Sequence, residues 1–96
     1  FKSWCLPAHW LMTITLRKKN LKNKLMKFLK KRGIETRQMI NPIENALHLV
    51  KYRDSKESII AKKISNNSLH LPSSTGLTSI QINHICSELK KYFKIK

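Results

Sequence analysis

The side chains that most often carry out catalysis or bind metals are few in this sequence and widely spaced. Four histidines and two cysteines are scattered along 96 residues, and Asp and Glu together number five. Metal sites need ligands at short spacings such as Cys-x-x-Cys, and two-carboxylate hydrolases need paired acids. Neither pattern occurs, and no phosphate-binding glycine loop or Ser-His-Asp set is recognisable. The sequence therefore predicts no metal site and no self-contained active site.

Net charge is the most unusual feature of the composition. Twenty Lys and Arg residues against five acids give a formal charge of +15, which favours anionic partners such as nucleic acids, anionic lipids or phosphorylated small molecules. The segment from Arg17 to Arg32 is strongly basic and contains no acid. It can be a patch for a polyanion or the solvated face of a helix. We favour the solvated face, because the cations lie opposite an apolar stripe.

The cysteines and the apolar segments limit the cellular setting. Cys5 and Cys86 can form one disulfide at most, unlike a disulfide-rich secreted protein, so we expect free thiols and a cytoplasmic location. Cys86 falls on the apolar face of a predicted helix, where we expect it to be buried. The stretch Trp10-Leu11-Met12 is far shorter than the roughly 20 apolar residues of a membrane span. Because residue 1 is Phe, we expect a processed chain or a piece of a longer protein.

The first half of the chain predicts a strand–helix–strand unit. Alternating apolar residues over 9–16 are typical of a strand, and a helix is expected over 20–32, capped by Asn20. Gly33 then ends the helix, since glycine readily adopts the left-handed conformation required there. A second strand over 34–40 would lie in the same sheet and run parallel to the first.

The middle of the chain has a weaker pattern. Residues 43–53 show no clear period and predict an irregular segment, which in a small domain often serves function. A helix is expected next, capped by Asp54 or Ser55 and with Ile60 and Ile64 facing inward.

The C-terminal part is the most regular. Residues 69–71 predict a short strand, and residues 73–76 predict a turn rather than a phosphate-binding loop. Thr78 and Gln81 have the spacing of a capping box, which begins an amphipathic helix over 79–93. Together these elements predict an α+β fold, a small sheet covered by helices.

Three stretches, in this order, resemble one enzyme family. Gly-Ile-Glu-Thr-Arg at 33–37 follows a helix, Leu-His-Leu-Pro-Ser-Ser-Thr-Gly-Leu-Thr occupies 69–78, and Gln-Ile-Asn-His-Ile-Cys at 81–86 leads into the last helix. Their order and spacing resemble the C-terminal domain of the DegT/DnrJ/StrS aminotransferases, which are largely sugar-nucleotide aminotransferases. The resemblance covers essentially the whole chain. It implies that residues 1–96 are the small domain of a fold-type I enzyme.

The resemblance also implies a reaction and partners. Family members use pyridoxal 5′-phosphate to move an amino group from glutamate to a keto-sugar linked to a nucleoside diphosphate. A large N-terminal domain holds the cofactor on a lysine, the small domain covers the pocket, and the enzymes are homodimers. No lysine of this chain matches the cofactor-lysine segment. The resemblance therefore implies that the 96 residues alone bind no cofactor and need the N-terminal domain.

Few family positions can be transferred to this sequence. Arg37 matches an arginine at the pocket edge, where its guanidinium could bind a diphosphate or a carboxylate with paired hydrogen bonds. It could instead pair with Glu35 or be solvated. Glu44 replaces the histidine of the family's Pro-Leu-His motif, and His48 lies shortly after it. Both are candidate substrate contacts, although Glu44 could also be an ordinary surface acid.

Two other functions stay open at this point. The basic segment 17–32 could bind nucleic acid, although aromatic residues at 7% leave little for base stacking. The chain could also be an inactive remnant. Exposed Trp4, Trp10 and Met39 would fit either a remnant or a domain that lacks its partner. A self-contained globule with residues 34–48 buried would contradict the need for a partner.

Overall fold

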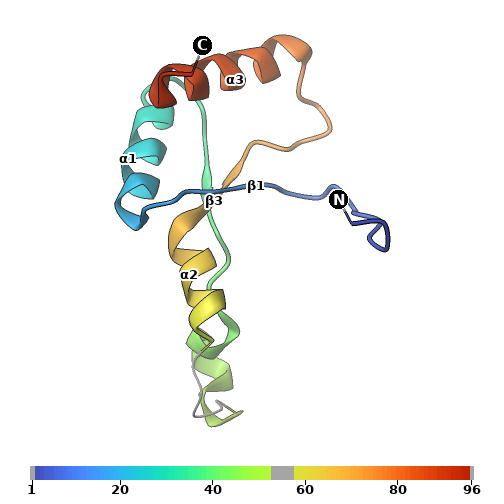
Figure 1. Ribbon diagram of the computed structural model, residues 1–96, viewed down its shortest axis with the longest axis vertical. Helices are drawn as coiled ribbons and strands as arrows, with labels where there is room; N and C mark the ends of the chain where they lie inside the picture. Colours follow the sequence, from blue (N-terminus) through green and yellow to red (C-terminus); the bar gives the residue numbers. More distant parts are fainter. Residues whose placement is uncertain (1, 53–57, 96) are drawn as a thin grey trace.

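The computed structural model describes residues 2–52 and 58–95, and it confirms the α+β class (Figure 1). The elements are short, and two 3-10 segments replace the irregular region expected after residue 42. In chain order they are β1 (Met12–Thr15), α1 (Lys19–Lys30), β2 (Arg37–Gln38), η1 (Ile43–Asn45), η2 (Leu47–Tyr52), α2 (Ile59–Asn67), β3 (Ser68–Leu71) and α3 (Ser79–Phe93).

The sheet has three strands in the order β1-β3-β2, and β3 pairs antiparallel with both neighbours. β1 and β2 therefore run in the same direction, as a helical crossover requires. The prediction that they lie in one sheet and run parallel is therefore confirmed, although they are not neighbours, because the crossover leaves a gap one strand wide. The last strand of the chain, β3, fills that gap.

The two ends of α1 differ in how well the sequence predicted them. At its C-terminal end, Gly33 has a φ of +73°, and the Ile34 amide donates to the Leu29 carbonyl at 3.0 Å. This is the glycine end that was predicted. At its N-terminal end, the predicted cap is wrong. Lys18 occupies the cap position, no side chain caps the helix there, and Asn20 lies inside the helix.

The hydrophobic core is small and lies between α1, α3 and one face of the sheet. Its buried members are Leu16, Leu25, Leu29, Ile34, Leu69, Leu71 and Ile85. The radius of gyration is 15.9 Å, whereas a compact chain of this length would have about 12.5 Å. Figure 1 shows why: α2 and the 3-10 segments form an arm below the sheet, and the N-terminal segment extends sideways, away from α1.

The arm carries uncovered apolar side chains. Ile60 is 73% exposed and Ile64 is 41% exposed, so the prediction that they face inward is wrong. Helix α2 begins after Ser58, whose hydroxyl accepts a hydrogen bond from an amide of the first turn. The predicted caps Asp54 and Ser55 lie outside the described residues. Since both side chains stay exposed in the described chain, the periodicity of α2 marks a face that is largely uncovered here.

Helix α3 has the predicted bounds, and its capping box is complete. Thr78 Oγ1 accepts a hydrogen bond from the Gln81 amide, and Gln81 Oε1 accepts one from the Thr78 amide. Ile85 is buried against the core, but Cys86 is exposed. The prediction that Cys86 is buried is wrong because the buried side of α3 is the one that carries Ile85 and Glu88.

A charged cluster fastens α3 to the end of α1. Glu88 is buried, and its carboxylate lies 2.6 Å from Lys91 Nζ and 2.6 Å from Arg32 Nε. The Arg32 guanidinium also stacks on the Phe28 ring, 3.4 Å from its centroid. Lys91 and then Arg32 hold the pKa of Glu88 below its usual value, against the opposing effect of desolvation.

Acid is expected to weaken this cluster. The pKa of Glu88 is lower in the folded chain than in the unfolded one, so its stabilising effect is present above about pH 4.5 and is lost as the pH falls through the folded value. In urea titrations, Glu88→Gln should lower the unfolding midpoint near neutral pH, and the difference should shrink below pH 4.5. Glu35→Gln removes one exposed negative charge as the control. A difference that stays constant with pH would contradict this assignment.

Candidate functional site

The sheet has a polar face on the side opposite the core. The strand register pairs Thr13 on β1 with His70 on β3, and His70 with Arg37 on β2. Directly paired residues in a sheet share one face, so these three side chains form a row across the sheet. Leu69 and Leu71 alternate with His70 and face the core. Thr13 therefore lies on the face opposite Ile14, as the alternation predicted.

His70 is the most constrained member of this row. The residue is only 6% exposed, and its Nδ1 atom lies 2.9 Å from Thr13 Oγ1. Its Nε2 is buried and has no hydrogen-bond partner among the described residues. A buried polar atom without a partner costs about 1–3 kcal/mol, so this atom needs an explanation that the described residues do not supply.

A hollow of about 330 Å³ opens beside this row. Its wall combines β2, β3 and the turn that follows β3. It is lined by Leu11, Glu35, Arg37, His70, Leu71, Pro72, Ser73 and Ser74. The turn brings two hydroxyls to the wall, and Ser74 Oγ accepts a hydrogen bond from the Gly76 amide at 3.2 Å.

Arg37 lies exposed at the wall of this hollow. Within the described residues it forms no ion pair, so the alternative pairing with Glu35 is absent. Glu35 is also exposed and lines the same hollow. A free guanidinium at the edge of a cavity is suited to bind an anionic group with paired hydrogen bonds.

The other two predicted substrate contacts lie on the arm. Glu44 Oε1 accepts a hydrogen bond from the Ser58 amide at 3.0 Å, which connects η1 to the start of α2. His48 is exposed on η2. Neither lines the hollow that Arg37 lines. The structure therefore gives Glu44 a local structural contact and leaves the substrate role of both residues as a prediction.

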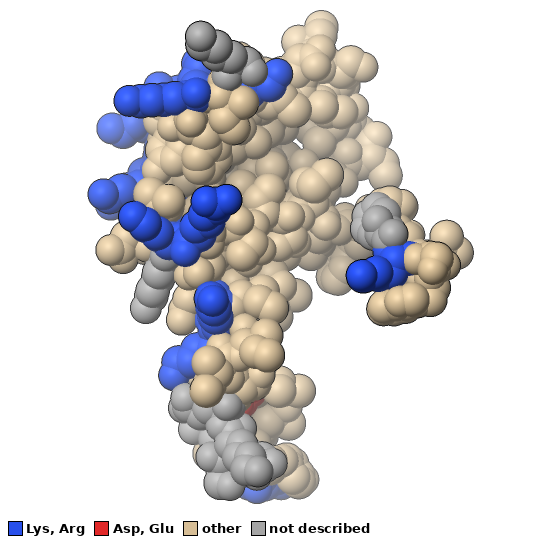
Figure 2. Space-filling model, in the orientation of Figure 1, with Lys and Arg blue, Asp and Glu red and all other residues tan. Residues whose placement is uncertain are grey.

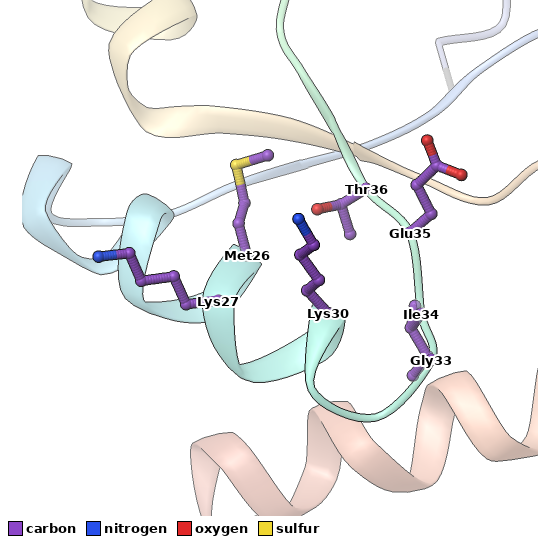
Figure 3. A pocket seen from close by; sticks show the side chains of 7 residues that line it. All are labelled: Met26, Lys27, Lys30, Gly33, Ile34, Glu35 and Thr36. Atoms are coloured by element: carbon purple, nitrogen blue, oxygen red, sulfur yellow. The ribbon is translucent and has the colours of Figure 1, made fainter.

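A second hollow, of about 550 Å³, lies between α1 and the strand that leads to β2 (Figure 3). Lys30 points toward Thr36 in it, whereas the Glu35 carboxylate points away from the lysines. Lys27 and Lys30 are exposed. Because exposed lysines are readily solvated and no buried polar group faces this hollow, we regard the first hollow as the candidate site.

The basic residues of α1 lie mainly on its solvated side. Lys24, Lys27 and Lys30 are exposed, opposite the buried stripe, and Figure 2 shows Lys and Arg side chains gathered on the side of the molecule where α1 lies. This supports the interpretation of segment 17–32 as a solvated helix face. Lys22 is the exception, because it is buried and its Nζ donates to the Ser65 carbonyl at 3.1 Å.

The match to known proteins identifies the class of the chain as an aminotransferase. The model of the DegT/DnrJ/EryC1/StrS aminotransferase family matches residues 4–90. The chain therefore belongs to this family, which confirms the resemblance carried by residues 33–37 and 69–78. A comparison with curated proteins gave no match. No described helix has the length and apolar character needed to cross a membrane.

Full-length enzymes of this family depend on pyridoxal 5′-phosphate, but the buried lysine that the structure describes in this chain does not fit the role of the cofactor lysine. The cofactor needs a lysine amine free to reach its aldehyde and a cradle for its phosphate. Lys22 is the buried lysine among those whose side chains are described, and its amine is bonded to Ser65 and, at 3.5 Å, to Gln38. We assign no cofactor contact to this chain.

Proposed function

We propose that this chain is the C-terminal small domain of an aminotransferase that moves an amino group from glutamate to a nucleotide-linked keto-sugar. In this proposal it covers the cofactor pocket of a large domain in a cytoplasmic homodimer, and it is inactive alone. The observation that carries the proposal is Arg37, an exposed guanidinium without an ion pair among the described residues, at the wall of a hollow in a chain of this family. Glu44 and His48 are further candidate contacts from the arm.

The exposed apolar surface supports a missing partner. Trp4 is 83% exposed and Trp10 is 75% exposed, while Met39 is half-buried. Ile43 and Leu47, within the region 34–48, are exposed as well. The described chain is therefore not the self-contained globule that would argue against a partner. Large apolar side chains gathered on one molecule usually mark an interface.

The assembled enzyme tests the proposal. The coding sequence upstream of Phe1 would be read, joined to this chain, and the product assayed for amino transfer from glutamate to nucleotide-linked keto-sugars. Arg37→Gln should lower kcat/KM about tenfold or more, since a charge-assisted hydrogen bond contributes about 1.5–3 kcal/mol. Arg17→Gln, which removes an exposed arginine outside the hollow, should not. An unchanged kcat/KM for Arg37→Gln would contradict the assigned contact.

The isolated chain offers a separate test of the cofactor assignment. Mixed with pyridoxal 5′-phosphate, the 96 residues should give no stoichiometric adduct that borohydride can trap, because the amine of Lys22, the buried lysine among those described, is held by the Ser65 carbonyl. Absorbance spectra and intact mass after reduction measure this. A single site modified in full at equimolar cofactor would show that the chain has a cofactor lysine of its own.

A further inference from the structure

We propose that His70 is a second donor beside Arg37, and that the two form a subsite for an anionic group with two or more acceptor oxygens. A carboxylate and a phosphate share this chemistry. The inference extends the proposed function, because it names the group that the Arg37 edge of the pocket would hold. It rests on the hollow, the buried Nε2 atom and the strand register, all of which belong to this chain alone.

The direction of the imidazole ring carries the first step. The two ring nitrogens of histidine point away from each other. Nδ1 contacts Thr13 on β1, so Nε2 is directed away from the Thr13 hydroxyl. Arg37 is the residue of β2 that pairs directly with His70. His70, with its buried and unpartnered Nε2, and Arg37, with its exposed guanidinium, therefore line the same hollow.

The protonation of the ring carries the second step. When the Thr13 hydroxyl donates to Nδ1, Nε2 carries the hydrogen and is a donor without an acceptor among the described residues. An oxygen of a bound anion would satisfy it and remove the cost of burying it unpaired. The second oxygen would accept from Arg37. The hydroxyls of Ser73 and Ser74 lie on the same wall and can donate as well.

Glu35 limits how strongly this subsite attracts anions. Its carboxylate lines the same hollow and offsets the charge of Arg37. A general polyanion would be drawn to the lysine side of α1 instead. The subsite should therefore select a small group that bridges His70 and Arg37, and removing the charge of Glu35 should strengthen binding.

Histidine resonances measure binding directly in the 96-residue chain. Inorganic pyrophosphate and glutarate would be titrated separately at constant ionic strength, with the His70 ring signals assigned from His70→Gln. We expect at least one anion to shift the His70 signals saturably while those of His84, on α3, stay unchanged. A response to pyrophosphate alone assigns a phosphate group, and a response to glutarate alone assigns a carboxylate.

Three variants separate a built subsite from general charge attraction. Arg37→Gln should weaken binding about tenfold, Glu35→Gln should tighten it about threefold, and Arg17→Gln should leave it unchanged. All three positions are exposed, so each variant should keep the parental circular dichroism spectrum. Failure of both anions to shift His70 would overturn the inference, as would an equal loss of affinity in Arg17→Gln. Either result would leave the activity test of the assembled enzyme intact.

Discussion

Replacing Leu29 with Ala is expected to remove a large share of the stability of the chain. Leu29 is fully buried in the small core, and a Leu-to-Ala change at such a site costs about 2–5 kcal/mol. A domain of this size has a total stability of only about 5–14 kcal/mol, and the uncovered arm suggests a value near the lower limit. Urea titration followed by far-ultraviolet circular dichroism measures the loss.

Leu47→Ala is the matched control for this change. It removes the same atoms from a side chain that is 87% exposed on η2, so the unfolding free energy should change by no more than about 0.5 kcal/mol. If both variants shift the urea midpoint equally, the core is not where the structure places it. Leu47 should become sensitive only in the presence of a partner that covers the arm.

Replacing Lys22 with Met is expected to loosen the arm. The Lys22 ammonium donates to the carbonyl of Ser65, near the end of α2, and thereby connects α1 to α2. Methionine keeps most of the apolar stem but leaves the Ser65 carbonyl without this donor, which costs about 1–3 kcal/mol. Amide hydrogen exchange should speed up in residues 59–67 more than in α3.

Lys24→Met serves as the control on the same helix. Lys24 is exposed, so its loss should change exchange in α2 very little while lowering the net charge by the same amount. Equal exchange rates in the two variants would show that the Lys22 hydrogen bond does not hold the arm. If amide hydrogen exchange in Lys22→Met speeds up equally along the whole chain, the variant has instead lost stability globally.

The elements that the sequence predicted best are those fixed by local chemistry. The capping box of Thr78 and Gln81 located the start of α3, and Gly33 located the end of α1. Both signals act within a few residues, so they do not depend on the rest of the fold. The cap expected at Asn20 was a weaker signal, since many polar residues resemble caps that are not used.

Burial was harder to predict, because the spacing of apolar residues shows which helix face they share but not whether another element covers that face. Ile60 and Ile64 share one face of α2 and are exposed, and Cys86 lies beside the buried Ile85 yet is exposed. The order of the strands in the sheet could not be predicted for a related reason. The gap between β1 and β2 is filled by β3. No local pattern in residues 9–40 indicates that a strand from much later in the sequence lies between them.

The candidate site was predicted only in part. Arg37 was expected at the pocket edge from the family motif, and the structure places it at the wall of a hollow. His70 was overlooked, although the alternation in Leu69-His70-Leu71 signals a polar side chain on the face opposite two core leucines. The burial of its ring and its pairing with Thr13 depend on strand register, which the sequence alone did not reveal.

The central position of β3 has a consequence for how the chain is made on the ribosome. β1 and β2 pair with β3 and not with each other, so neither can join a sheet until residues 68–71 have left the exit tunnel. β1 and β2 must therefore wait for β3 before this sheet can form, and the sheet closes by long-range contacts, which are slow to form. Vectorial synthesis thus leaves this sheet dependent on β3, and premature termination before residue 68 would leave β1 and β2 without the strand that joins them.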